Sequence, residues 1–177
     1  MDSMVNILLE RAENEILAAE VLKKMSEDES SKKLFKFTKE KTFYSSVISH
    51  SYYGIFYSAK ALLLTKNIKT AAPDVHKKTF EEFKENFVDT GVLDVEFLEI
   101  YKKMIVRADS LLEIFKDEKW KRGNFTYNTI PQANKEPAED SLKNSKFFFS
   151  NISKVIKNIE YKENMKNENI TGETKKR

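Results

Sequence analysis

The scarcity of helix-breaking residues constrains this chain more than any other feature of its sequence. Its 177 residues include only 4 glycines and 3 prolines. Along most of the chain, apolar residues recur three and four positions apart, which is the spacing that gives a helix one apolar side. Long helices joined by a few turns satisfy both observations, so we expect an all-α fold.

Size and composition predict a single helical domain. The 40% hydrophobic content suffices for one core in a chain of 177 residues, and a second independent domain is not expected. After about Tyr161 the helical spacing is lost and the residues turn polar. We therefore expect a helical bundle over residues 1–160 and a polar, flexible C-terminal tail over residues 161–177.

Charge and cysteine content narrow the functional classes. The 31 basic and 28 acidic residues leave a net charge of +3, so any binding of an anion must be local. The absence of cysteine excludes disulfides and thiolate chemistry, and it agrees with a reducing cytoplasm. The N-terminus carries no basic segment followed by an apolar one, and no apolar run approaches the length of about 20 residues that a membrane span needs. We expect a cytoplasmic protein without membrane contact.

Five helices are expected from the apolar spacing, over residues 4–25, 39–66, 74–88 and 94–119 and from about residue 137 onward. The second is apolar almost all round, which is typical of a helix surrounded by others, so it should be central. Asp74 is a plausible N-cap of the third helix, and Gly91 is a plausible stop after it.

The second helix carries two sides of contrasting character. One side holds mostly small residues, over which another helix can approach closely: Val47, Ser51, Gly54, Ser58 and Ala61. Another side is aromatic with polar tips: His50, Tyr53, Tyr57 and Lys60. We expect the second side to face a cleft or a partner. The alternative is that the tyrosine rings pack inside and their hydroxyls bond to nearby backbone.

A polar segment, Arg122-Gly123-Asn124-Phe125-Thr126-Tyr127, lies in the long connection before the last helix. Long connections inside compact domains are uncommon and usually functional. Arg122 could clamp a phosphate that Asn124 and Tyr127 position. Alternatively, Arg122 satisfies carbonyl groups at the end of the preceding helix, and Phe125 and Tyr127 hold the loop against the core. Two charged residues of the preceding helix are also candidates for this region: Arg107 and Asp109.

Several enzyme classes lack support in the sequence. With two histidines and no cysteine, a zinc site would need carboxylates to complete it, and no HExxH-type spacing occurs. A glycine-rich phosphate loop, the Glu-x-x-His pattern of di-iron bundles and a glycine-flanked serine elbow are also missing. We expect neither a metal nor a cofactor.

Three pieces of the chain together resemble HEPN domains, the higher eukaryotes and prokaryotes nucleotide-binding group. The first is the aromatic-rich run Ser51-Tyr52-Tyr53-Gly54-Ile55-Phe56-Tyr57-Ser58-Ala59-Lys60-Ala61-Leu62-Leu63. The second consists of His76, Phe80, Phe83, Phe87, Val88 and Gly91. The third is Arg122-Gly123-Asn124-Phe125 followed by Glu136-Pro137-Ala138-Glu139. Their order and spacing are similar to the small, single-domain HEPN subfamily over about residues 4–159. The resemblance implies an up-and-down bundle of four to five helices that commonly dimerises across a face containing the conserved-motif region.

The same resemblance implies nucleotide chemistry. Many HEPN proteins are metal-independent ribonucleases, often toxins paired with a small nucleotidyltransferase, and their motif is an arginine, four to six residues and a histidine. Arg122 matches the arginine, but Tyr127 occupies the histidine position. A phenol with a pKa of about 10 is a poor base near neutral pH. His50 is the nearest replacement base, whereas His76, on the phenylalanine-rich side of its helix, is better explained as a core or capping residue.

These observations favour a HEPN-like protein that binds a nucleotide or RNA. The expected ligand contacts are Arg122, Asn124, Tyr127, Tyr53, Tyr57 and Lys60. A homodimer is expected, as is the HEPN role in a toxin–antitoxin pair with a nucleotidyltransferase. One alternative is an active ribonuclease in which Arg122, Tyr127 and His50 carry catalysis. The other is a non-catalytic adaptor that recruits a partner protein through its helix faces.

Overall fold

The computed structural model describes residues 3–121 and 135–174, with side chains through residue 108 and for residues 135–162, 164 and 165. Every regular element in these two ranges is helical, which confirms the expected all-α bundle. The elements are α1 (Ser3–Glu27), α2 (Glu29–Leu34), α3 (Tyr44–Leu64), α4 (Val75–Phe83), the π-helical turn η1 (Lys84–Val88), α5 (Val95–Lys121) and α6 (Lys135–Thr174).

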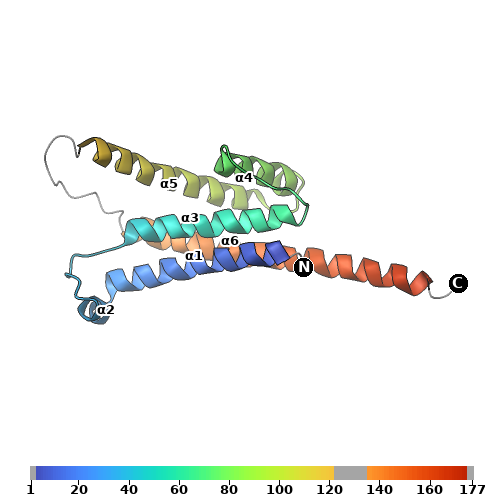
Figure 1. Cartoon of the computed structure of the whole chain (residues 1–177), viewed down its shortest axis with the longest axis horizontal. Coiled ribbons are helices and arrows are strands. Elements are labelled where there is room, and N and C mark those ends of the chain that lie inside the picture. Colours follow the sequence, from blue (N-terminus) through green and yellow to red (C-terminus); the bar gives the residue numbers. More distant parts are fainter. Residues whose placement is uncertain (1–2, 122–134, 175–177) are drawn as a thin grey trace.

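The four long helices, α1, α3, α5 and α6, alternate in direction along the bundle, as Figure 1 shows. Helix α3 packs against α1, α4, α5 and α6, so the prediction that the second expected helix is central is confirmed. Its buried side chains join those of α5 and α6 in a core whose largest members are aromatic: Phe83, Phe87, Tyr101 and Phe148. A smaller apolar cluster joins α1, α3 and the start of α6.

The small-residue side of α3 is where α1 approaches. All five of its residues are buried: Val47, Ser51, Gly54, Ser58 and Ala61. A Cβ atom added at Gly54 would lie 2.8 Å from Cγ1 of Ile16 on α1. Glycine at position 54 therefore allows the close approach of α1 to α3 that the small-residue pattern predicts.

Three details of the expected elements are corrected. The second expected helix begins at Tyr44 rather than near residue 39, and an additional short helix, α2, precedes it. Asp74 occupies the N-cap position of α4, as expected, but its backbone is left-handed, with φ 60°, and its side chain makes no capping hydrogen bond. Gly91 follows η1 with φ 72°, the conformation expected of a helix stop.

Helix α6 continues beyond the part of the chain expected to form the bundle. Its last residues, up to Thr174, project past the other helices (Figure 1). Tyr161 in this extension is 64% exposed. The division into a bundle over residues 1–160 and a flexible tail over residues 161–177 stays a prediction. Within the described ranges, no helix has the length and apolar character required to cross a membrane.

Candidate functional site: an aromatic face on α3

The predicted phosphate-binding segment cannot be placed. Arg122, Asn124 and Tyr127 lie outside the described residues, between the end of α5 and the start of α6. Their proposed contacts stay predictions. The other predicted site residues, on α3, are described.

The aromatic side of α3 lies at the molecular surface. Tyr53 is 38% exposed, and His50, Tyr57 and Lys60 are partly exposed. By contrast, Tyr52 is only 8% exposed and packs into the core. The alternative in which the tyrosines of this side pack inside does not describe Tyr53.

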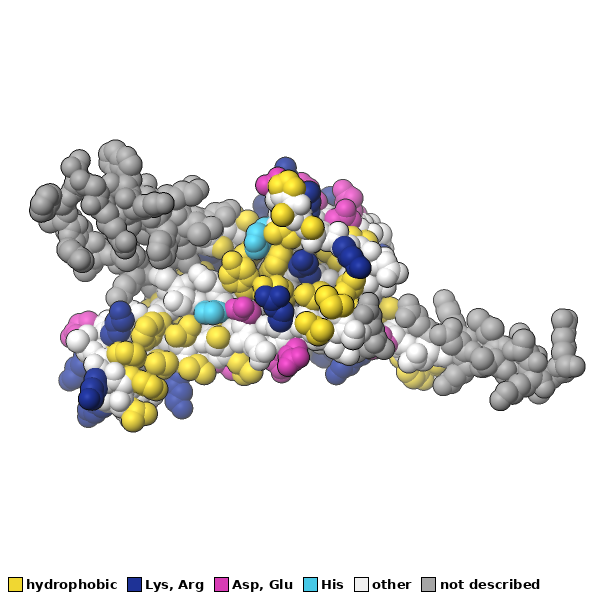
Figure 2. Space-filling view, viewed as in Figure 1, with side chains coloured by type: hydrophobic (Ala, Val, Ile, Leu, Met, Phe, Trp, Pro, Cys, Tyr) yellow, Lys and Arg dark blue, Asp and Glu magenta, His cyan; other side chains and the backbone are white. Residues whose placement is uncertain are grey.

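The exposed tyrosines belong to a continuous set of rings, which we call the aromatic face. Its members are Tyr52, Tyr53, Phe56 and Tyr57 of α3 and His76 of α4. The Tyr53 and Tyr57 rings are stacked, with centroids 6.1 Å apart and planes 26° apart. Figure 2 shows hydrophobic side chains gathered beside the two histidines on this side of the molecule. An exposed, stacked pair of rings can hold a further planar group by stacking.

Arg11 of α1 supplies a cation to the aromatic face. Its guanidinium carbon lies 4.2 Å from the centroid of the Tyr57 ring, and its Nη2 donates a hydrogen bond of 2.7 Å to the Tyr57 hydroxyl. The residue remains exposed. It can therefore offer its remaining N–H groups to a ligand anion while the ring holds it in place.

His50 is oriented by a carboxylate from α1. Its Nδ1 lies 2.6 Å from Oε2 of Glu15, and both side chains are partly exposed. No partner of Nε2 is found in the described part of the chain. His50 precedes Tyr53 by three positions, so both lie on the same side of α3. A histidine held in this way can exchange protons with a bound ligand.

His76 closes the other end of the aromatic face. The sequence predicts a core or capping residue, but the side chain is only half-buried. Its ring lies 4.3 Å from that of Phe56, and its Nδ1 is 2.7 Å from the Tyr52 hydroxyl. Both histidines of the protein therefore border the same surface.

The Lys60 ammonium is a second cation near the rings, after the Arg11 guanidinium. Its Nζ lies 5.6 Å from the centroid of Phe56 and donates a hydrogen bond of 3.2 Å to the Thr70 carbonyl. This bond ties the loop before α4 to α3. The charge stays at the border of the aromatic face, where a ligand phosphate could reach it.

Arg107 has a structural role that the sequence leaves open. Its Nη2 lies 2.8 Å from Asp140 and its Nη1 donates to Ser141 at 2.9 Å, so it joins α5 to α6. The Lys103 ammonium and the Arg107 guanidinium, by hydrogen bonds and charge, hold the pKa of Asp140 below its usual range. The side chain of Asp109, the other charged candidate on this helix, lies outside the described ones.

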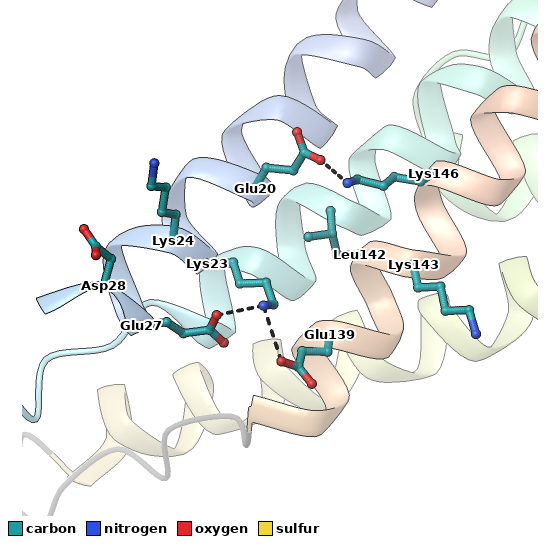
Figure 3. Close-up of a pocket in the computed structure, with 9 residues that line it drawn as sticks. All are labelled: Glu20, Lys23, Lys24, Glu27, Asp28, Glu139, Leu142, Lys143 and Lys146. Carbon is teal, nitrogen blue, oxygen red and sulfur yellow. Dashed lines mark hydrogen bonds and ion pairs between the residues drawn. The ribbon is translucent and has the colours of Figure 1, made fainter. Parts of the chain in front are cut away.

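A groove of about 660 Å³ lies between α1 and the start of α6. Its charged lining is balanced, with four lysines and four carboxylates, and Figure 3 shows Lys23 between Glu27 and Glu139 at 2.8 and 3.3 Å. Lys146 pairs with Glu20 across the same groove. Because these charges neutralise one another, the groove offers less to an anion than the aromatic face does.

Comparisons with known proteins find relatives of the chain in Methanocaldococcus jannaschii and Thermotoga maritima. It is 32% identical over 120 residues to the protein named "putative toxin MJ0605" of Methanocaldococcus jannaschii, covering 68% of this chain and 76% of the relative. The chain belongs to the family of MJ0605. A second protein of that organism, "putative toxin MJ0142", shares 37% identity over 81 residues, which cover 43% of this chain and 53% of the relative.

A more distant member of this group of relatives is a UPF0332 protein of Thermotoga maritima. It is 25% identical over 114 residues, covering 64% of this chain and 74% of the relative. No family model and no solved structure matches the chain. The names of MJ0605 and MJ0142 both contain the words "putative toxin", which agrees with the resemblance to toxin-type HEPN proteins.

The main contributions that sequence reasoning missed come from α1. Arg11 and Glu15 are spaced four positions apart on the side of α1 that meets α3, and they contact Tyr57 and His50. Their spacing shows that they share a helix face. Nothing in the sequence says which helix that face meets.

Proposed function

We propose that this member of the MJ0605 family is a HEPN-like, toxin-type protein that binds a nucleotide or RNA. The observation that carries the proposal is the exposed Tyr53–Tyr57 pair with the Arg11 guanidinium against it. The names of the relatives support the toxin-type role. The proposed setting is the cytoplasm.

The chemistry of the aromatic face suits an unpaired nucleotide. Every base has a π-face that can stack on tyrosine, and such stacking contributes about 1–3 kcal/mol per base. Arg11 and Lys60 stand beside the rings and can receive the phosphate. Since the net charge is only +3, this local placement matters more than the overall field.

The connection between α5 and α6 is proposed to supply the remaining phosphate contacts. Arg122 would bind the phosphate, and Asn124 and Tyr127 would donate hydrogen bonds to it. Tyr127 in place of a histidine favours binding over cleavage, because an ordinary phenol is protonated near neutral pH. The proposed assembly is a homodimer, with a nucleotidyltransferase as antitoxin.

A metal-independent ribonuclease is the second candidate function, and the His50–Glu15 pair favours it. In that reaction the RNA 2′-hydroxyl attacks the adjacent phosphorus, its proton passes to His50 and the bond to the 5′-oxygen breaks. Arg122 would stabilise the charge on the phosphorane, and water would protonate the leaving oxygen. The products are a 2′,3′-cyclic phosphate and a free 5′-hydroxyl.

Binding and cleavage of a labelled single-stranded RNA should be measured side by side for the wild type, Tyr53→Ala, Arg11→Ala and Arg122→Ala. Loss of one stacked base at Tyr53 should weaken binding by about 5- to 150-fold. Tyr161→Ala is the matched control, since Tyr161 is an exposed tyrosine on the α6 extension, away from the aromatic face. Equal affinity for wild type and all three site variants would contradict the proposal and favour the adaptor.

The same measurement, with His50→Ala added to the variants, decides between binding and cleavage. A ribonuclease should leave cyclic phosphate ends, and the His50→Ala and Arg122→Ala variants should lose this activity. RNA that stays intact after prolonged incubation at high protein concentration would exclude cleavage, whatever the binding result.

A further inference from the structure

Helix α1 has a second apolar side, which points away from the bundle. Its core side holds the buried residues Val5, Ala12, Ile16 and Ala19. On the opposite side four large apolar residues are between 46% and 57% exposed: Met4, Ile7, Leu17 and Val21. Figure 2 shows hydrophobic side chains along the part of the surface that α1 forms. A helix at the surface of a bundle needs only one apolar side to pack on the core, so the second apolar side of α1 is not used within this chain's bundle.

This outer side follows a seven-residue repeat. If Met4 is placed at position a, the a and d positions are Met4, Ile7, Arg11, Asn14, Ala18, Val21 and Met25. The flanking g positions are Glu10, Leu17 and Lys24. We call these ten residues the outer seam. Such a repeat is the pattern by which one helix packs lengthwise on another.

We propose that the outer seam packs against the same seam of a second copy, with the two α1 helices antiparallel about a twofold axis near Leu17. The proposal rests on the homodimer proposed above and assigns it a surface, but it does not depend on RNA binding. In this pairing Ile7 faces the partner's Met25, and Leu17 faces the partner's Leu17. A twofold contact requires such self-complementarity.

Charge favours the antiparallel arrangement over the parallel one. Antiparallel helices pair g positions with g positions and e positions with e positions. The g positions set Glu10 opposite the partner's Lys24 at both ends of the contact, while the e positions set Glu15, which is bonded to His50, opposite the partner's Glu15 at its centre. Parallel helices would pair g with the following e position and set Glu10 opposite the partner's Glu15, a pair of like charges. Only the antiparallel dimer therefore gives both ends an attractive pair.

Glu10 and Lys24 are available for this pairing. In the described ranges neither forms an ion pair, although Lys23, the neighbour of Lys24, is paired with Glu27 and Glu139. Figure 3 shows the Lys24 side chain directed away from that cluster. Asn14 and Arg11 interrupt the apolar seam near its middle, and a polar residue at such a position fixes the register of two helices.

The outer seam adjoins the aromatic face, because Arg11 belongs to both. Its aliphatic part lies in the seam while its guanidinium stacks on Tyr57. A dimer formed through the outer seam would therefore leave Tyr53 outside the contact, because Tyr53 lies on the side of Arg11 that faces α3. One assembly would carry two copies of the proposed nucleotide site.

Cysteine crosslinking tests the arrangement directly, because the chain contains no cysteine of its own. Leu17→Cys should give a covalent dimer under mild oxidation, seen on a non-reducing gel. Val95→Cys, at an exposed apolar residue of α5, is the matched control and should stay monomeric on the gel. Ile7→Cys should crosslink when mixed with Met25→Cys but not by itself, since the two Ile7 residues would be separated by about 27 Å along the helices.

Light scattering of the wild type separates the possible failures. A monomer at all concentrations up to the millimolar range would overturn both the homodimer and the outer seam. A dimer in which Leu17→Cys does not crosslink would overturn the outer seam alone. Neither result bears on the RNA-binding measurement.

Charge reversal provides a second test that does not use crosslinking. Glu10→Lys and Lys24→Glu should each raise the dimer dissociation constant, because each variant places like charges opposite one another. An equimolar mixture of the two should dimerise like the wild type, since both pairs become attractive again. Circular dichroism confirms that each variant is folded. A mixture that is no tighter than the separate variants would overturn the antiparallel pairing.

Discussion

Two tyrosines of the core differ in what their hydroxyl groups contact. The Tyr52 hydroxyl lies 2.7 Å from Nδ1 of His76. The Tyr101 hydroxyl is fully buried among aromatic rings and has no hydrogen-bond partner in the described part of the chain. Burial, together with the neighbouring Tyr52, raises the pKa of Tyr101 well above its usual value. A buried hydroxyl without a partner lowers the stability of the folded state.

We therefore expect opposite effects from the same chemical change at these two positions. Tyr101→Phe should raise the free energy of unfolding by about 1 kcal/mol, because it removes an unsatisfied polar atom. Tyr52→Phe should lower it by about 1 kcal/mol, because it leaves the His76 nitrogen without this bond. Urea unfolding followed by circular dichroism measures both. Equal losses in the two variants would mean that the Tyr101 hydroxyl is bonded in the folded protein.

At the candidate site, the sequence predicts which residues of α3 are exposed but not what they contact. The separation of Tyr53 from Tyr52 follows from helical periodicity, since the two point to different sides. Arg11, Glu15 and His76 join the site through tertiary packing. Such packing depends on how whole helices meet, and local spacing carries no information about it.

At the scale of elements, the long helices are predictable because each has an apolar side that the core needs. The short helix α2 was not predicted, although its N-cap has a recognisable chemistry. The Asp28 carboxylate accepts hydrogen bonds from the Ser30 and Ser31 hydroxyls and from the Ser31 N–H, and these bonds hold its pKa well below the usual range. In the sequence alone, Ser30 and Ser31 beside charged residues suggest a loop, because their hydrogen bonds to Asp28 cannot be seen there.

The contact between α1 and α3 at Gly54 gives a prediction at the same scale. Alanine at position 54 gains about 1 kcal/mol of helix propensity, but its Cβ would lie 2.8 Å from Ile16 Cγ1. Overpacking of this kind costs about 1–3 kcal/mol, so Gly54→Ala should lower the free energy of unfolding. Thermal or urea unfolding measures the change.

A double-mutant cycle shows whether the cost comes from this contact. In an Ile16→Ala background the clash is absent, and Gly54→Ala should then be neutral or stabilising by up to about 1 kcal/mol. If Gly54→Ala costs the same with isoleucine or alanine at position 16, the loss has another origin.

At the scale of the whole molecule, α6 divides into a part inside the bundle and a part beyond it. Phe148, Ile152 and Ile156 are fully buried in the core, whereas Tyr161 and Met165 are exposed. Figure 1 shows the end of α6 extending past the other helices. Residues that bury no apolar surface contribute little to the cooperative stability of a domain.

A chain that ends at Lys162 should therefore keep the stability of the full protein. We expect its thermal midpoint to change by less than about 2 °C, because none of the core side chains that the structure describes is removed. A chain that ends at Lys154 is the control: it also loses Ile156 and Ile159, which pack in or against the core, and its midpoint should fall. The comparison tests the division at about residue 160. If removing residues 163–177 alone lowers the midpoint as much as the longer truncation does, the bundle includes the α6 extension, and the extension must then pack against another surface in solution.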